Sequence, residues 1–209
     1  MVQQRRGRGR PTGSRVDPAV RYEELLDAAE SAIREHGPQA SLVEVARHAG
    51  FGRSAVYALF PSRNAMLAAL SKRHVARIMT TLAERTRGAD DPRERVSAFI
   101  DNLCAWIEDE PQLYRALSGH ALMGGDDEHG IFEELADATE QVLTKNLREL
   151  GAPTDAAAPW SRAMIGSTAA AAAWWQRTAT MSRAELVQHL TVLSWGGGVR
   201  MPLYPPPGE

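Results

Sequence analysis

The sequence predicts an all-α protein in which a small N-terminal helix-turn-helix domain of three helices precedes a larger helical domain. Apolar side chains recur every three or four residues along most of the chain, and no stretch shows a convincing strand pattern. Gly and Pro interrupt the helical pattern at several points, where Ser or Asp is placed to cap the next helix. The chain has 209 residues, 44% of them hydrophobic, which is enough for a sizeable core.

Charge is divided unequally along the chain. Residues 1–87 hold 15 Lys and Arg against 8 Asp and Glu, a net charge of +7, whereas residues 88–209 hold 9 against 18, a net charge of −9. A positive field lowers the free energy at which a polyanion approaches. We therefore expect the N-terminal half to meet a polyanion, which charge alone does not identify.

Residues 1–16 are predicted to form a flexible basic arm. They contain five Arg and three Gly with few apolar side chains, so they bury too little surface to offset the entropy of ordering. Within them, Arg8, Gly9, Arg10 and Pro11 resemble the core of an AT-hook, whose arginines enter the narrow minor groove of A·T-rich DNA. The alternative is a tail that is only attracted to phosphates.

The first helix is expected to begin at Pro18 behind a cap at Asp17, and to end before Gly37 and Pro38. Its inward face is predicted from helical spacing to comprise Tyr22, Leu25, Leu26, Ala29 and Ile33.

Two short helices follow, separated by Gly50. Ser41 is placed to cap the first, and Glu44 completes a possible capping box. Gly50 tolerates the left-handed conformation of a tight turn, and the second helix runs from just after it to about Leu59. Neither helix is long enough to be stable alone, so both must pack against their neighbours.

The remaining helices are longer. Ser62 caps a helix predicted over residues 63–87, which at 1.5 Å per residue is about 37 Å long and bridges two parts of the molecule. Beyond Gly88, five helices are predicted, over residues 92–110, 111–123, 132–150, 160–180 and 182–195, with the last one stopped at the glycines 196–198.

Two short helices that cross at a steep angle suit the DNA major groove, where one crosses the backbone and the next reaches the base edges. The second helix is expected to present Arg53, Ser54, Tyr57 and Ala58 outward. Arg53 would bond a guanine edge or a phosphate, Tyr57 a phosphate, and Arg63 a further phosphate at the start of the next helix. The alternative is a solvated charged face with Tyr57 packed in the core.

The segments LLDAAESAIREHG and SLVEVARHAGFGRSAVYALFPSRNAML, within residues 25–70, resemble the N-terminal DNA-binding domain of the TetR family of bacterial transcription regulators. The resemblance implies that the helix ending at Leu59 is the recognition helix and that Tyr57 and Arg63 contact phosphates. It also implies an all-helical C-terminal regulatory domain that binds a small ligand and dimerises. Beyond Arg87 it depends on helix number and length alone.

Two positions depart from the family pattern. Gly52 stands where Ser or Thr often caps the recognition helix, and Leu59 stands where His is frequent. Gly is an acceptable cap, so the departures affect the expected affinity and not the fold. The candidate DNA-binding residues are Arg8, Arg10, Ser41, Gly52, Arg53, Ser54, Ala55, Tyr57, Ala58 and Arg63.

A run of five alanines, residues 169–173, precedes Trp174 and Trp175. Small residues let two helices approach closely, and the resemblance implies a dimer interface made by the last two long helices of each subunit. The candidate interface residues are Ala169, Ala170, Ala173, Trp175, Leu186, Leu190 and Leu193. The alternative is that the alanines pack only within one subunit.

A ligand pocket is expected among the helices of the C-terminal half, lined by aromatic side chains with a few polar groups. The candidates are Phe99, Asn102, Leu103, Trp106, Tyr114, His120, Met123, Met164 and Trp174; for each of them taken singly, the alternative of plain core is favoured. The absence of an Arg or Asn cluster favours an apolar or aromatic molecule over a sugar or nucleotide.

No cofactor and no metal site is predicted. His120 and the acidic stretch 126–129 have no diagnostic ligand spacing, so a solvated loop is favoured. The single cysteine, Cys104, is interpreted as a small buried apolar residue.

The expected function is a homodimeric transcriptional regulator, a repressor that binds a pseudo-palindromic operator and is released by a small apolar or aromatic molecule. A cytoplasmic location is expected because no apolar run is long enough for a membrane span. The alternatives are an architectural, low-specificity DNA-binding protein and, because common catalytic motifs are absent, less favourably a helical enzyme. The expected organisation is an arm (1–16), a DNA-binding domain (17–62), a connecting helix (63–87), a ligand-binding and dimerisation domain (88–199) and a disordered tail (200–209).

Overall fold

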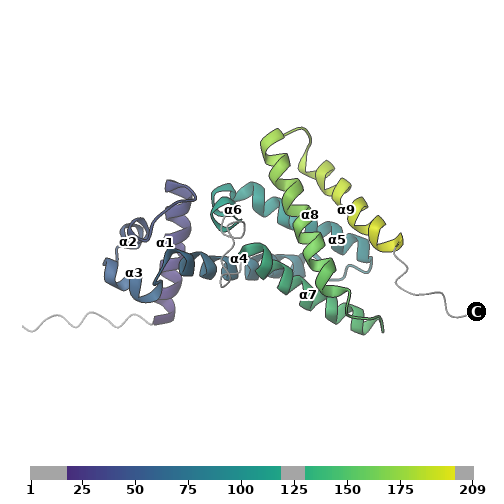
Figure 1. Ribbon diagram of the computed structural model, residues 1–209, viewed down its shortest axis with the longest axis horizontal. Coiled ribbons are helices and arrows are strands. Elements are labelled where there is room, and N and C mark those ends of the chain that lie inside the picture. Colours follow the sequence, from purple (N-terminus) through teal and green to yellow (C-terminus); the bar gives the residue numbers. More distant parts are fainter. Residues whose placement is uncertain (1–17, 119–129, 201–209) are drawn as a thin grey trace, which may run out of the picture.

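The computed structural model describes residues 18–118 and 130–200, and this part of the chain contains nine helices and no strand. The helices are α1 Pro18–His36, α2 Leu42–Ala49, α3 Arg53–Leu59, α4 Arg63–Arg85, α5 Pro92–Asp109, α6 Pro111–Ser118, α7 Ile131–Glu149, α8 Ala157–Thr178 and α9 Arg183–Arg200. In Figure 1, α1–α3 form a group at one end, α4 leads away from it, and α5–α9 gather at the other end. The predicted all-α class is confirmed.

Caps set the ends of α2. The Ser41 hydroxyl accepts the backbone N–H of Glu44 at 3.4 Å, and the Glu44 carboxylate accepts the backbone N–H of Ser41 at 2.6 Å, so the predicted capping box is present. Gly50 ends the helix with φ 66° and ψ 19°, a left-handed conformation that favours glycine. The turn between the two short helices therefore lies where the sequence predicts it.

A buried cluster from α1 and α4 holds the two short helices in place. Phe60, directly after α3, is 2% exposed, and its ring centroid lies 5.6 Å from that of Tyr22. Val56 is the buried residue of α3. Other members of the cluster are Leu25, Leu26, Ile33, Val45, Met66 and Leu67. Because each such side chain contributes about 1.5–3 kcal/mol on burial, α2 and α3 are stable in this setting although they are too short to be stable alone.

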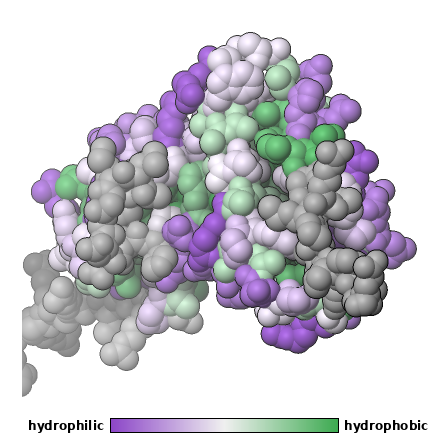
Figure 2. Space-filling model, turned by 45° about the vertical axis from the view of Figure 1, so that its right-hand side comes forward, coloured by the Kyte–Doolittle hydropathy of each residue, from purple (hydrophilic) through white to green (hydrophobic). Residues whose placement is uncertain are grey.

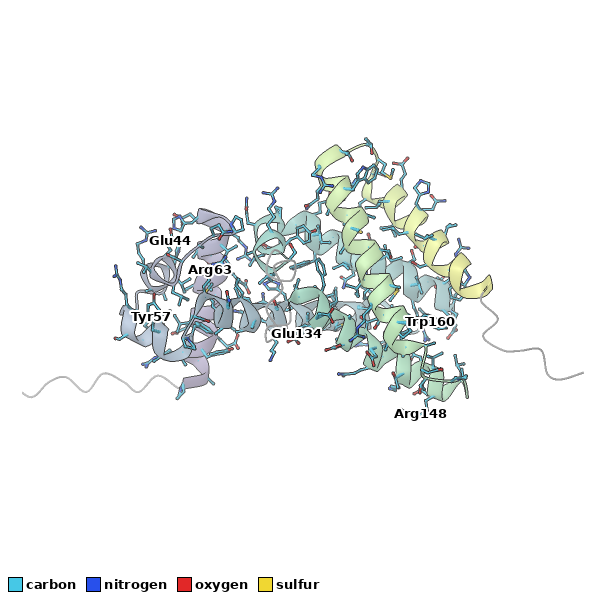
Figure 3. All side chains as sticks on the ribbon, in the orientation of Figure 1. Glu44, Tyr57, Arg63, Glu134, Arg148 and Trp160 are labelled. Carbon is cyan, nitrogen blue, oxygen red and sulfur yellow. The ribbon has the colours of Figure 1, made fainter. Side chains whose placement is uncertain are left out.

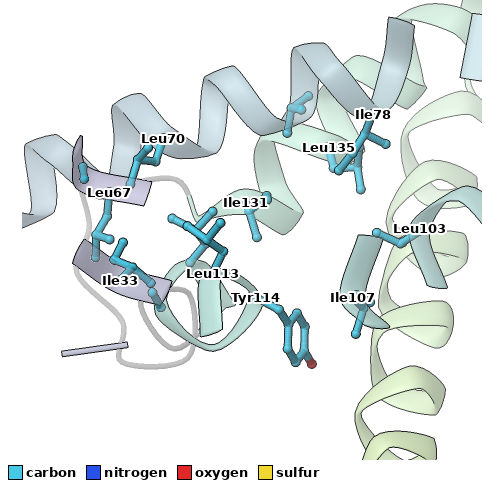
Figure 4. Packing of buried hydrophobic residues seen from close by; sticks show 14 of the residues in the cluster. Ile33, Leu67, Leu70, Ile78, Leu103, Ile107, Leu113, Tyr114, Ile131 and Leu135 are labelled. Carbon is cyan, nitrogen blue, oxygen red and sulfur yellow. The ribbon is translucent and has the colours of Figure 1, made fainter. Parts of the chain in front are cut away.

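The helix α4 belongs to both ends of the molecule. It packs on α1 at one end and on α5, α6 and α7 at the other. Figure 4 follows this continuous core from Ile33 and Leu67, past Leu113 of α6, to Leu103 and Ile107 of α5. Among these residues, the apolar packing continues without a break from the N-terminal helices to the C-terminal ones.

In the C-terminal part, α7 packs along α8, α5 along α9, and α8 against α9. Arginines join the layers: Arg162 of α8 donates to Asp137 and Glu140 of α7 at 2.9 Å and 2.7 Å. Arg183 at the start of α9 donates to Glu108 of α5 at 2.6 Å. Figure 1 shows α8 and α9 running antiparallel along one edge of the molecule.

Some helix ends differ from the predicted ones. The predicted stop of α9 at residues 196–198 is wrong, since the helix continues to Arg200. Glycine lowers helix stability by about 1 kcal/mol relative to alanine but does not by itself end a helix. The helix α8 begins at Ala157, three residues earlier than predicted, so the preceding linker is shorter.

Other expectations fall outside the described residues. They concern the cap at Asp17, the basic arm, the end of the helix predicted to reach Met123, and the C-terminal tail.

Candidate DNA-binding surface and regulatory domain

The outward face of α3 is exposed as predicted. Tyr57 is 47% exposed, which excludes the alternative that packs it in the core. Arg53, Ser54 and Ala58 are also exposed, whereas Val56 faces inward. Figure 3 shows Tyr57 at the end of the molecule farthest from the C-terminal helices. The first turns of α3 therefore present a cation and a phenol hydroxyl to solvent.

Three other candidate DNA-binding residues lie in or at the start of the two short helices: Gly52, Ala55 and Ser41. Gly52 lies at the N-cap of α3 with no side chain to bond the free N–H groups, and Ala55 is half-buried. Ser41 is engaged in the capping box of α2. A hollow beside them is lined by Val43, Glu44, Ala46, Arg47, Phe51, Gly52 and Arg53, so the seam between α2 and α3 is open at the surface.

Arg63 takes part in packing as well as in surface charge. Its Nε donates to the carbonyl of Ala40 at 3.1 Å, and its Nη2 donates to the carbonyl of Pro38. Burial lowers the pKa of its guanidinium, which nevertheless stays protonated. Arg63 thus fastens the first turn of α4 to the loop before α2, and two of its donors are occupied within the chain.

A buried carboxylate joins α1 to α4. Glu30 is 4% exposed; its Oε1 accepts from Arg77 Nη1 at 2.8 Å, and its Oε2 accepts from Arg34 Nη2 at 3.1 Å. Burial alone would raise the pKa of Glu30, but contact with His74 and the charges of Arg77 and Arg73 outweigh burial and lower the pKa to about 2. The carboxylate is therefore ionised at neutral pH.

The same network reaches the C-terminal helices. Arg34 donates to both carboxylate oxygens of Glu110, between α5 and α6, at 2.7 Å and 2.9 Å. Trp106 Nε1 of α5 donates to Nδ1 of His74 at 3.2 Å. Because an indole N–H only donates, Nδ1 is the acceptor of this bond, and Nε2 is the ring nitrogen that faces Glu30. That Nε2 lies 3.4 Å from Glu30 Oε1 but is poorly aligned for a hydrogen bond.

An aromatic row continues from this network into the C-terminal core. The ring centroid of Trp106 lies 5.7 Å from that of His74 and 6.4 Å from that of Tyr114. Tyr114 in turn lies 6.2 Å from Phe132, edge to face. Burial raises the pKa of Tyr114, so its phenol stays neutral at physiological pH. The row links α4, α5, α6 and α7.

The predicted ligand-binding residues fall into four groups. Phe99 and Leu103 are fully packed, and the buried Asn102 donates to the carbonyl of Ile78 at 2.9 Å. Trp106 and Tyr114 belong to the aromatic row. Trp174 is 41% exposed on the outer side of α8, whereas Met164 is half-buried. His120 and Met123 lie outside the described residues, as does the acidic stretch 126–129.

The predicted interface residues divide between the two sides of α8 and α9. Ala169, Trp175, Leu186 and Leu190 pack inside the same subunit, with the Trp175 indole donating to the carbonyl of Met181 at 2.7 Å. Ala170 and Leu193 are exposed, and Ala173 is half-buried. Val192, which was not predicted, is 54% exposed beside Leu193 at 63%. Figure 2 is turned so that the C-terminal helices come forward, and it shows apolar surface between hydrophilic regions there.

Glu30 and His74 are not among the residues predicted from the sequence. A signal was present, because His74 lies four residues after Leu70 and four before Ile78 on the inward face of α4. Glu30 similarly follows Leu26 by four residues on α1. A titratable residue within an apolar helix face indicates a buried, paired group.

Cys104 is buried, and burial raises its thiol pKa to about 12, in agreement with its interpretation as a small apolar residue. Among the described helices, none is long and apolar enough to cross a membrane.

Comparison with known proteins follows the same division of the chain. Residues 25–70 match the model of the bacterial regulatory proteins of the tetR family, and residues 81–201 match the tetracyclin repressor-like C-terminal domain. The chain belongs to the TetR family. It is a transcriptional regulator that combines an N-terminal DNA-binding domain with a C-terminal ligand-binding domain.

Relatives and solved structures agree with this membership. An uncharacterized HTH-type transcriptional regulator of Mycobacterium tuberculosis is 26% identical over 185 residues, covering 84% of this chain and 76% of the relative. The HTH-type transcriptional activator FasR of Mycolicibacterium smegmatis is 24% identical over 208 residues, 96% of this chain and 95% of the relative. Thermus thermophilus FadR, a TetR-family repressor solved with lauroyl-CoA, has a TM-score of 0.69 at 20% identity, covering 90% of this chain and 98% of the other; it shows a shared fold.

Proposed function

We propose that this TetR-family regulator is a homodimeric repressor that holds two α3 helices against a pseudo-palindromic operator and releases it when an apolar molecule binds the C-terminal domain. The observation that carries the proposal is the exposed face of α3, with Arg53 and the 47% exposed Tyr57 free for contact. The family membership supports the proposal, because the matched N-terminal domain contains α3.

On the operator, α3 would enter the major groove, where Arg53 bonds a base edge or phosphate and Tyr57 a phosphate oxygen. The exposed Ser54 lies close enough in sequence to add a further contact from the same turn. Arg63 would act chiefly by fixing the loop before α2, since it donates to the carbonyls of Pro38 and Ala40. Two copies of α3 about 34–36 Å apart would contact successive half-sites.

The proposed dimer uses the outward faces of α8 and α9. Ala170 and Ala173 leave room for a close helix approach, while Trp174, Val192 and Leu193 supply exposed apolar area. Burying these side chains in a second copy would recover about 25 cal/mol for each Å² of apolar surface removed from water. Sedimentation of the full chain at micromolar concentration would show a dimer, and a Leu193→Asp variant would shift it towards monomer.

The proposed ligand site lies around the aromatic row of Trp106, Tyr114 and Phe132. These rings offer apolar surface with an indole N–H and a phenol hydroxyl for orientation, which suits an apolar or aromatic molecule. Because Thermus thermophilus FadR was solved with lauroyl-CoA, an acyl chain is a suitable first probe.

The proposed coupling runs from Trp106 through His74 to Glu30. A ligand that displaces the Trp106 indole breaks its 3.2 Å bond to His74 Nδ1, and this changes the groups that hold Glu30 of α1 against α4. Ligand binding would then favour a position of α1–α3 that no longer fits the operator. The contact that a ligand must break is a single hydrogen bond, worth about 0.5–1.5 kcal/mol.

Two further experiments test the proposal. The first selects DNA from a random pool with the full-length protein: a two-fold symmetric consensus is expected, whereas recovery of unrelated fragments would favour the architectural alternative.

The second measures binding of the selected operator with and without lauroyl-CoA. We expect a weakening of 5–150-fold, the usual order for coupled sites. Trp106→Phe, which keeps an aromatic ring but removes the donor, should reduce the response, and Trp160→Phe is the matched control. If Trp106→Phe binds lauroyl-CoA and responds as fully as the parent protein, the proposed coupling is wrong.

A further inference from the structure

Three side chains of types that can ligate a metal lie together where the last turn of α1 is beside the last turn of α2. One donor atom each from Glu35, His36 and His48 lies within 4.8 Å of the other two. Glu35 Oε2 is 3.0 Å from His48 Nε2, and Glu35 Oε1 is 3.7 Å from His36 Nε2. The two imidazole ring centroids are 5.5 Å apart.

The two separations between Glu35 and the histidine nitrogens are close to those between ligands of one metal ion. With metal–nitrogen and metal–oxygen bonds of about 2.0–2.2 Å, ligand atoms around a tetrahedral zinc ion lie roughly 3.3–3.6 Å apart. The Glu35 side chain is 61% exposed and so has the freedom to make the small adjustment required. Two imidazoles and one carboxylate form a ligand set that Zn²⁺ uses in proteins.

The hydrogen bonding already sets one ligand in the required form. Arg47 Nη2 lies 2.9 Å from His36 Nε2. A guanidinium only donates, so this nitrogen of His36 accepts from Arg47 and carries a lone pair that a metal ion could use. The exposed Arg47 side chain would swing into solvent when a metal ion takes its place.

The position of the cluster in the fold also favours a cation. Glu35 and His36 are the last two residues of α1, and His48 lies in the last turn of α2. The C-terminal end of each helix carries a partial negative charge from its free carbonyl groups. Two such ends meet here, and in the structure Arg47 supplies the positive charge between them.

We propose that Glu35, His36 and His48 form a binding site for a divalent transition-metal ion of the Zn²⁺ class, with water as the fourth ligand. The ion links the end of α1 to the end of α2. The helix α2 is directly followed by the Gly50 turn and α3. Metal binding therefore stabilises the DNA-binding unit, independently of any ligand in the C-terminal domain.

The test is a titration of the metal-free, full-length protein with Zn²⁺ by calorimetry, and with Co²⁺ by visible absorption, which reports tetrahedral coordination. The parent protein should bind one ion per chain at this site. His36→Gln and His48→Gln should each weaken binding by more than the 10–100-fold that follows loss of an outer-shell partner. His189→Gln, which removes an exposed imidazole of α9, is the matched control and should bind like the parent.

A variant with the opposite expected sign sharpens the test. Arg47→Ala removes the cation that competes for His36, so Zn²⁺ should bind more tightly. Zn²⁺ should also raise the unfolding temperature of the parent and of His189→Gln, but not that of a His36→Gln/His48→Gln double variant. Zn²⁺ affinity unchanged in the double variant, or no binding by the parent at micromolar concentrations, would overturn the proposal.

Discussion

The N-terminal helices α1–α3 and the C-terminal helices α5–α9 are stabilised in different ways. The helices α2 and α3 have 8 and 7 residues and depend on a capping box, a left-handed Gly50 and a small buried cluster. The C-terminal helices α5, α7, α8 and α9 have 18 to 22 residues, bury larger faces and are joined by arginine–carboxylate bonds. A functional surface made from short helices can therefore be predicted from local sequence signals, but its fold is also easily destabilised.

The largest expected effect tests how strongly the N-terminal unit depends on its few core residues. Phe60→Ala removes a ring that is 2% exposed between α1 and α3, and should lower the free energy of unfolding by about 3–5 kcal/mol. Urea unfolding followed by circular dichroism measures it. Leu150→Ala, at a side chain 79% exposed in the C-terminal part, should change stability by less than about 0.5 kcal/mol. Equal losses of unfolding free energy in the two variants would contradict the expected dependence of the N-terminal unit on Phe60.

The next effect concerns the network that joins the two regions. Glu30→Gln removes the buried carboxylate that Arg77 and Arg73 face, and should cost about 3 kcal/mol, the amount by which folding favours the ionised form of Glu30. Glu24→Gln on the exposed face of α1 is the control and should be nearly neutral.

The pH dependence gives an independent check on Glu30. Because its pKa falls from an ordinary 4.5 to about 2 on folding, its ionisation stabilises the protein fully above pH 4.5, and this stability is lost as pH falls towards 2. The loss is of order 3 kcal/mol. Unfolding measured from pH 6 to pH 2 should show a smaller loss in Glu30→Gln than in the parent protein, and parallel curves would show that Glu30 is not the group responsible.

A smaller effect separates function from stability within the N-terminal unit. Arg53→Ala should weaken operator binding by about 1–3 kcal/mol while leaving the unfolding transition unchanged, because its side chain is exposed. Arg93→Ala removes the same charge from the exposed start of α5 and should leave affinity nearly unchanged. Fluorescence anisotropy with labelled operator measures both, and equal losses would mean that only net charge matters.

The smallest effect compares the same cap in the two regions. Ser41 and Ser182 both form capping boxes, with Glu44 and Glu185. Replacing a capping Ser by Ala costs about 1 kcal/mol. Ser41→Ala should reach or exceed that value, because α2 has only 8 residues, whereas Ser182→Ala should fall below it on the 18-residue α9. Thermal unfolding of the two variants gives the order, and a reversed order would contradict the dependence on helix length.

Sequence patterns were sufficient for the N-terminal unit because its signals are local. Ser41 with Glu44, Gly50 and the polar face around Tyr57 each predict a feature within a few residues of themselves. The structural role of Arg63 was not predictable from the sequence. Its acceptors at Pro38 and Ala40 are backbone atoms that lie more than 20 residues away.

The C-terminal part was less predictable for a different reason. The helix α8 is apolar on several sides, so helical spacing does not decide that Trp175 faces inward and Trp174 outward. That choice depends on the neighbouring α5, α7 and α9, which no local pattern positions. The glycines near the end of α9 similarly predicted a stop that the helix does not make.

The bonds from Arg63 to the carbonyls of Pro38 and Ala40 have a consequence for hydrogen exchange. Because the first turn of α4 is fastened to the loop before α2, the amides of α2 should not open to deuterium by local fraying of that loop alone. They should exchange together with those at the start of α4, as one cooperative unit, even though α2 is short and lies near the surface.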